Sequence, residues 1–278
     1  MSNIETINRR RSCRTYDPRP VEPGKLAELT EFLLSNRTGP FDGRLRFQLL
    51  ALDEMQPEDI RHLGTYGVIR GARCFIVGAV GRDPHAMEDY GYAMERNILK
   101  ATSLGLGTCW MGGTFRRSEF ARQVNLAEDE LLPAITPVGY PGERRSATER
   151  FFRFSAGSDQ RKAWGELFYD RDTATPLSRE SAGPYAKALE CVRIGPSASN
   201  KQPWRIVRTE GVFHFYLSKT PLYDTFFKDI PLQNIDMGIA MCHFELASLE
   251  IGQAGAWKVE PTVLPEDWEY IASWVAGR

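Results

Sequence analysis

The sequence predicts an α+β (mixed α/β) protein in which helices pack on mixed sheets and one structural unit occurs twice. Three observations favour this class. Helical patterns alternate with β-rich runs, two long helical segments can be overlaid without a gap, and the 278 residues, 42% of them hydrophobic, can bury one large core or two smaller ones. We therefore expect a tandem duplication of this unit.

Each half is expected to begin with a helix, continue through two strands and reach a long helix. The strand candidates are the β-rich runs 46–51, 74–80, 134–138, 204–207 and 212–217. We place the first half at residues 1–175, including the connector. The connector is the tract rich in Arg, Ser, Thr and Asp between about residues 144 and 183. The second, shorter half covers residues 176–278.

The repeat is clearest in the long helical segments 89–110 and 236–257. Both carry apolar residues at helical spacing and should end near the glycine that follows. A chance agreement between two amphipathic helices is the alternative, because small and apolar residues recur on any core helix. The ungapped overlay pairs Asp89/Asp236, Gly91/Gly238, Ala93/Ala240, Met94/Met241, Leu99/Leu246, Gly105/Gly252 and Trp110/Trp257.

Composition and charge favour small-molecule partners. The formal charge of −1 and the pI of about 6.5 provide no field that attracts nucleic acid or a membrane surface. The first residues lack a basic segment followed by an apolar signal core, so we expect a cytoplasmic protein. The five cysteines form no CxxC and no ligand-spaced set with the four histidines, which predicts reduced thiols and no metal site.

Two polar segments carry the candidate binding chemistry. Residues 9–14 hold four arginines and a serine just before a helix, a compact donor set suited to a phosphate dianion. A solvated basic cluster is the alternative. Residues 196–204 form a turn rich in Pro, Ser, Asn and Gln that should close before a strand, and a simple polar loop over a buried tryptophan is its alternative.

Together these segments resemble the paired signatures of the FMN-dependent nitroreductase family, in a divergent single-chain type with two nitroreductase-like halves. The resemblance implies that Arg10, Ser12 and Arg14 hold the phosphate, ribityl and pyrimidine oxygens of FMN, with Arg11 beside them. In that family the second loop comes from the opposite subunit of a homodimer. The residues that it places at the flavin here are Pro196, Ser197, Ala198, Ser199, Asn200 and Gln202.

Two further segments match the same pattern. Residues 105–115 are rich in glycine but follow a helix, whereas a dinucleotide fingerprint follows a strand. By resemblance, Trp110, Met111, Gly112 and Gly113 line one flavin face, and a backbone N–H of Gly112 or Gly113 points at N5. A plain helix-ending turn would not need the second glycine pair. Residues 137–145 resemble the segment that returns a basic residue to the phosphate, for which Arg144 and Arg145 are the candidates.

Each half keeps only part of this pattern. The resemblance therefore implies that the two halves form an intramolecular pseudo-dimer, with one FMN site per chain, and that the protein is a monomer. The expected activity is hydride transfer from NADH or NADPH, through FMN, to a nitroaromatic, a quinone or a similar small-molecule acceptor. No side chain is required as a proton donor, so no catalytic residue is named. The alternatives are a flavin-binding or regulatory protein without turnover, and a divergent family member that fragments flavin or dehalogenates its substrate.

Overall fold

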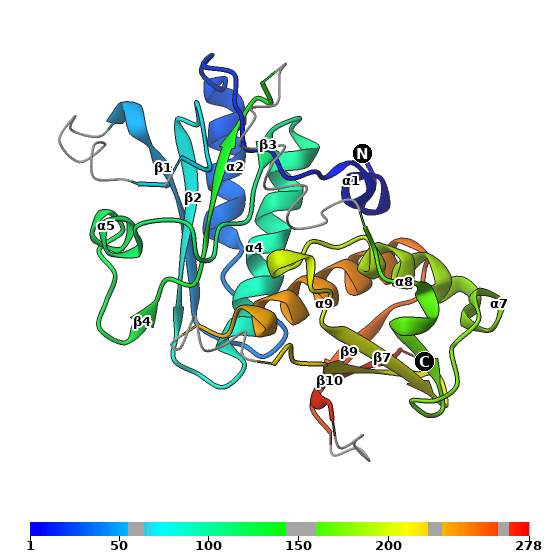
Figure 1. Cartoon of the computed structure of the whole chain (residues 1–278). Coiled ribbons are helices and arrows are strands. Elements are labelled where there is room, and N and C mark those ends of the chain that lie inside the picture. The colour runs from blue at the N-terminus through cyan, green and yellow to red at the C-terminus, as the bar shows by residue number, and fades with distance from the viewer. Residues whose placement is uncertain (55–63, 66, 143–159, 222–229, 261–266, 278) are drawn as a thin grey trace. The chain divides into compact units, whose positions relative to one another are not determined.

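The computed structural model describes residues 1–54, 64, 65, 67–142, 160–221, 230–260 and 267–277. The chain forms two compact units, one of Arg9–Gly157 and one of Met1–Asn8 with Ser158–Arg278. Figure 1 shows the helices and strands of both units along the chain. Within the described ranges, no helix combines the length and the apolar character needed to cross a membrane.

The Arg9–Gly157 unit contains an antiparallel sheet of order β1-β2-β5-β3, with β4 pairing the end of β2. Every residue of β2 is buried, as expected for a strand covered on both faces. The elements are α2 (Pro23–Ser35), β1 (Leu45–Ala51), the 3₁₀ turn η1 (Leu52–Glu54), β2 (Cys74–Gly81), α4 (Ala86–Ser103), β3 (Gly107–Thr108), α5 (Arg117–Gln123), β4 (Glu130–Leu131) and β5 (Ile135–Gly139).

Alternate residues of β2 meet different helices. Phe75 and Val77 pack in one apolar cluster with Phe120 of α5. On the opposite face, Gly78 lies under the rings of Phe47 and Tyr90, and a side chain at this position would collide with Phe47. The helices α2 and α4 therefore cover one face and α5 the other, as Figure 1 shows.

The second unit contains a sheet of order β6-β7-β8-β10-β9, in which β6 runs parallel to β7 and the remaining pairs are antiparallel. Its elements are α1 (Asn3–Arg9), η2 (Trp164–Glu166), β6 (Phe168–Asp170), α7 (Arg179–Ala182), η3 (Gly183–Tyr185), α8 (Ala186–Arg193), η4 (Ala198–Asn200), β7 (Trp204–Thr209), β8 (Val212–Leu217), α9 (Leu232–Glu250), β9 (Gly255–Lys258) and β10 (Glu269–Ala276).

Aromatic side chains dominate the core of this unit. The Phe244 ring of α9 lies 5.2 Å from Phe213 and 5.3 Å from Phe215, which both project from β8. Trp257 and Trp274 close the same cluster with ring centroids 5.2 Å apart. Edge-to-face and tilted packing of such rings contributes beyond simple area burial.

The two sheets share one topology. In each unit a helix leads to two paired strands, a long helix and two further strands, and the order β1-β2-β5-β3 corresponds to β7-β8-β10-β9. The mixed α/β class with helices on sheets is confirmed, and the five β-rich runs of the sequence all form strands. A duplication as the origin of this likeness stays a prediction.

The connector lies differently from the expected division at residue 175. Residues from Ser158 onward cluster with the second half, because β6 forms a parallel ladder with β7. Residues 1–8 also join this unit, where the backbone N–H of Ile4 donates to Glu250. Hydrogen bonds to partners distant in sequence, rather than chain order, decide where these segments pack.

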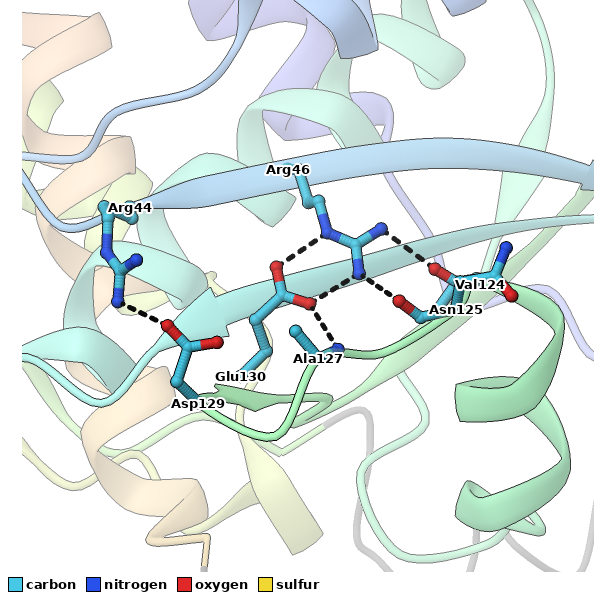
Figure 2. A network of polar contacts seen from close by, with 7 residues as sticks. All are labelled: Arg44, Arg46, Val124, Asn125, Ala127, Asp129 and Glu130. Carbon is cyan, nitrogen blue, oxygen red and sulfur yellow. Dashed lines mark hydrogen bonds and ion pairs between the residues drawn. The ribbon is translucent and has the colours of Figure 1, made fainter.

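A polar network ties the edge strand β1 to the segment after α5 (Figure 2). The guanidinium of Arg46 donates to both carboxylate oxygens of Glu130, at 2.7 and 2.5 Å, and to the carbonyls of Val124 and Asn125. Glu130 in turn accepts from the N–H of Ala127. Arg46 thus satisfies carbonyls at the end of α5 that have no partner inside the helix.

We expect Arg46→Met and Glu130→Gln to show a coupling of about 1 kcal/mol in a double-mutant cycle of the unfolding free energy, because the pair is bidentate and half-buried. The hydrogen bond from Arg46 lowers the pKa of Glu130. The stabilisation should therefore be present at neutral pH and be lost as the pH falls through this lowered pKa.

Urea unfolding at neutral pH and at about pH 3 measures both effects. Arg44→Met is the control, because its partner Asp129 is exposed and the pair should contribute little. A neutral-pH coupling that does not exceed the error of the measurement would contradict the prediction.

Candidate functional site

The opening motif is held as an additional edge segment beside β3. Ser12 forms a parallel bridge with Thr108, and the Cys13 N–H donates to the Thr108 carbonyl at 2.7 Å. Further along, Tyr16 forms an antiparallel bridge with Pro141, and its N–H donates to the backbone carbonyl of Arg70. Strand pairing therefore brings Ser12 and Cys13 next to the segment that leads into Trp110.

The arginines of this motif have distinct environments. Arg10 is buried, and its Nε lies 3.8 Å from Oε1 of Glu95. Burial lowers the pKa of Arg10, and the charge of Glu95 opposes this shift. The Nη1 of Arg14 is buried and has no hydrogen-bond partner among the described residues. Arg11 is exposed, and its side chain donates to the Arg10 carbonyl.

These donors fit an anionic, oxygen-rich ligand such as FMN. A buried guanidinium nitrogen without an acceptor costs free energy that a ligand oxygen would recover. The hydroxyl of Ser12 is half-buried beside the two arginines in sequence and adds a neutral donor. No group of three or more His, Cys, Asp or Glu side chains in the described part of the chain is arranged to hold a metal ion.

The segment from Trp110 to Gly113 is held by one side chain on each side. The Trp110 indole donates to Oε2 of Glu95 at 2.6 Å. Arg117 donates to the Gly112 carbonyl at 2.7 Å and to the Leu132 carbonyl at 2.8 Å, while stacking on Phe115. The Gly112 peptide is thus oriented by a helix-borne arginine that the sequence pattern did not single out.

Two of the predicted flavin-lining residues differ in exposure. Gly113 is exposed, whereas the Met111 side chain is 2% exposed and packs in the core cluster around Phe75. The backbone N–H and carbonyl of Met111 both pair with Ile135. Met111 therefore anchors this segment to β5, and the following glycines form the accessible part.

Residues 196–202 form a strained loop in the second unit. Ser199, Asn200 and Gln202 have φ values of 48°, 55° and 49°. This left-handed region is unfavourable for residues other than glycine, although Asn tolerates it better than most. Such strain persists only where neighbouring contacts hold the backbone.

Two interactions hold the start of this loop. The N–H of Ala198 donates to both carboxylate oxygens of Asp236, at 2.9 and 3.1 Å. The Ser197 hydroxyl accepts from the Gln202 N–H at 2.9 Å. Asp236 is buried at the start of α9, and this burial raises its pKa well above the ordinary value.

The amide side chains of the loop bind the connector. The Oδ1 of Asn200 accepts from Arg161 at 2.9 Å, and its Nδ2 donates to the Gln160 carbonyl at 2.8 Å. The Oε1 of Gln202 accepts from the Lys162 N–H. Pro196, Ser197 and Ala198 are half-buried and Ser199 is exposed. The loop is therefore organised by contacts inside its own unit.

The first unit has a counterpart of the Asp236 contact. Asp89, its partner in the sequence overlay, accepts from the N–H groups of Phe41 and Gly43 at 2.9 and 2.7 Å. Each long helix thus begins with a buried carboxylate, which holds the loop before β1 in the first unit and the loop before β7 in the second. Burial raises the pKa of Asp89 to about 6.

Arg144 and Arg145 lie outside the described residues. The last described residue before them, Gly142, donates its N–H to the Thr15 carbonyl at 2.9 Å. Residues 196–202 and residues 9–14 belong to different units, so a contribution of this loop to the flavin site expected in the first unit stays a prediction.

Sequence reasoning missed four residues that organise these segments, namely Glu95, Arg117, Arg161 and Asp236 as a loop anchor. A charged residue inside an otherwise buried helix was the available signal for Glu95, since such residues are rarely buried without a partner. The partners of Arg117 and Arg161 are backbone carbonyls and an amide, which no spacing rule indicates.

Comparison with known proteins gives consistent matches. A family model described as "Putative TM nitroreductase" matches residues 3–248. A curated protein of Methanothermobacter thermautotrophicus, named "Putative NADH dehydrogenase/NAD(P)H nitroreductase", is 26% identical over 160 residues, which cover 54% of this chain and 83% of that protein. The crystal structure of a "putative nitroreductase" from Thermotoga maritima has a TM-score of 0.63 at 20% identity and covers 99% of this chain and 93% of its own, which shows the same fold.

We expect Asp89→Asn to change the pH dependence of stability. Because the pKa of Asp89 is raised to about 6, its neutral form is favoured in the folded state. The stabilisation from the protonated Asp89 side chain is complete below the pKa that Asp89 has in the unfolded chain, and it is lost as the pH rises through about 6. Relative to the Asn variant, the wild type should lose roughly 2 kcal/mol of unfolding free energy between about pH 4 and about pH 7.

Denaturant unfolding across this pH range measures the difference. Asp42→Asn is the matched control, since Asp42 is an exposed carboxylate in the loop that Asp89 holds. Asn also tolerates the positive φ of this position. Parallel pH profiles of the wild type and Asp89→Asn would show that Asp89 does not titrate in this range.

Proposed function

This chain belongs to the family described as "Putative TM nitroreductase", and from that premise we propose that it is an FMN-dependent oxidoreductase. Its reductant is NADH or NADPH, and its acceptor is a nitroaromatic, a quinone or a similar small molecule. The name of the Methanothermobacter relative supports the nicotinamide reductant. Family membership alone does not select an acceptor.

One observation carries the proposal. The opening motif and the Trp110–Gly113 segment are far apart in sequence, yet Ser12 and Cys13 pair with Thr108, two residues before Trp110. Two segments that resemble flavin-contacting signatures therefore lie together in one compact unit. A simple solvated arginine cluster would not need this pairing.

Different residues of this unit would bind different parts of FMN. Arg10 supplies donors for the phosphate, and Ser12 supplies one for a ribityl oxygen. The Nη1 of Arg14, which has no partner among the described residues, supplies one for a pyrimidine oxygen. The positive charge of Arg14 would favour negative charge at the pyrimidine. When bound, FMN supplies the redox chemistry.

The glycines provide backbone groups rather than side chains. Arg117 fixes the Gly112 carbonyl, which orients the neighbouring peptide N–H groups. No described residue accepts a hydrogen bond from the N–H of Gly112 or Gly113. These donors are available to a ring nitrogen that comes close to a backbone without Cβ atoms.

Purified protein reconstituted with FMN should be yellow, hold about one FMN per chain and bleach anaerobically when NADH or NADPH is added. The one-to-one ratio follows from the single Arg-rich motif, which only the first unit carries. Absorbance at the flavin band with a protein assay gives the ratio.

The outcomes separate the alternatives. Bound flavin that does not bleach would favour a binding or regulatory protein. Two FMN per chain would overturn the single-site model, and no binding after reconstitution would overturn the flavin assignment.

Arg14→Ala should weaken FMN binding by about tenfold or more, because a charge-assisted hydrogen bond is lost. Its melting temperature should not fall, because the deleted Nη1 has no hydrogen-bond partner among the described residues. Quenching of flavin fluorescence gives the affinity, and a thermal melt without FMN gives the stability.

Arg19→Ala is the control, since Arg19 lies just beyond the motif and stacks on Tyr140 at 3.8 Å. Equal FMN affinities of the wild type and Arg14→Ala would remove Arg14 from the site.

A further inference from the structure

A single buried carboxylate on α4 joins the two flavin-like segments of the first unit. The Glu95 side chain has no exposed surface. Its Oε1 lies 3.8 Å from Nε of Arg10, and its Oε2 accepts from the indole of Trp110 at 2.6 Å. One side chain therefore contacts Arg10 in the arginine-rich motif and Trp110 in the glycine-rich segment.

The ion pair constrains Arg10 in a specific way. The carboxylate faces the Nε of the guanidinium, and Arg10 itself is only 7% exposed. A buried guanidinium needs a compensating charge, and Glu95 is the carboxylate within ion-pair distance of it among the described residues. Loss of that charge would release Arg10 from its present position or leave it uncompensated.

The second unit contains a partial counterpart that lacks the arginine. Trp257, the overlay partner of Trp110, donates its indole N–H to Oε2 of Glu245 on α9 at 2.7 Å. Glu245 is half-buried and forms no ion pair with another described residue. The indole contact alone therefore occurs in both units, whereas the link to an arginine occurs in the unit that carries the phosphate motif.

We propose that Glu95 is a positioning residue that holds Arg10 for the phosphate of FMN, and so gives the site its preference for FMN over flavin without a phosphate. The proposal rests on the proposed flavin function and adds a residue that lies outside the four segments resembling flavin signatures. Glu95 acts through Arg10, and it does not contact the ligand. Its second contact, to Trp110, keeps the carboxylate oriented toward the motif.

The test compares FMN with riboflavin, which lacks the phosphate, in the wild type and in Glu95→Gln. Gln can still accept the Trp110 indole, but it carries no charge to hold Arg10. We expect the FMN affinity of Glu95→Gln to fall by about tenfold or more, and its riboflavin affinity to stay within about threefold. Flavin fluorescence titration of the full chain gives both dissociation constants.

Glu245→Gln is the matched control, because it neutralises a helix glutamate that also accepts a tryptophan indole. It should leave the ratio of FMN to riboflavin affinity at the wild-type value. Circular dichroism and a thermal melt establish that each variant is folded. If Glu95→Gln does not fold, Glu95→Asp replaces it, since Asp keeps the charge but withdraws it from Arg10 by one methylene, and the same fall in the ratio is expected.

The other outcomes overturn the inference. An equal loss of FMN and riboflavin affinity would assign Glu95 a general structural role. An unchanged or increased FMN affinity would mean that the carboxylate does not position Arg10, or that it competes with the phosphate. The wild-type titrations decide the proposed flavin function separately, because a wild type that binds neither flavin fails before any variant is compared.

Discussion

A buried carboxylate at the start of each long helix must find hydrogen-bond donors, and this requirement organises both units. Asp89 obtains them from Phe41 and Gly43, and Asp236 from Ala198. In each case the donor is a backbone N–H in the loop between a helix and the strand that follows it, β1 in the first unit and β7 in the second. Because an unsatisfied buried carboxylate would cost several kcal/mol, the long helix and that loop must form together. The strand that follows the loop starts from a defined position as a result.

Along the helix α4, three buried polar side chains each bond to a different segment of the first unit. Asp89 holds the loop before β1, Glu95 holds Arg10 and Trp110, and Asn97 accepts from Asn36 at the end of α2. Each of these three polar side chains fixes a different segment, while apolar neighbours on the helix pack against the sheet. The binding segments are therefore positioned by a rigid element, which is the arrangement that precise ligand recognition requires.

The two units use equivalent positions for different purposes. The loop held by Asp236 contains three left-handed residues and binds the connector through Asn200 and Gln202, whereas the loop held by Asp89 lacks these amides. Conversely, the arginine-rich motif pairs with β3 in the first unit only. A shared topology thus carries two specialised loops, which agrees with the partial signatures in each half of the sequence.

The sequence by itself determined the mixed α/β class, the five β-rich strands, the long helices and the segments that resemble flavin signatures, because periodicity and short motifs are local properties. It did not indicate β6 and its parallel pairing with β7, or that residues 1–8 pack with the second half. Only the tertiary structure decided that Met111 lies in the core, that Asn200 binds the connector and that Glu95 joins Arg10 to Trp110. The physical reason is that burial and pairing depend on groups distant in sequence, whose partners exist only once the chain has folded.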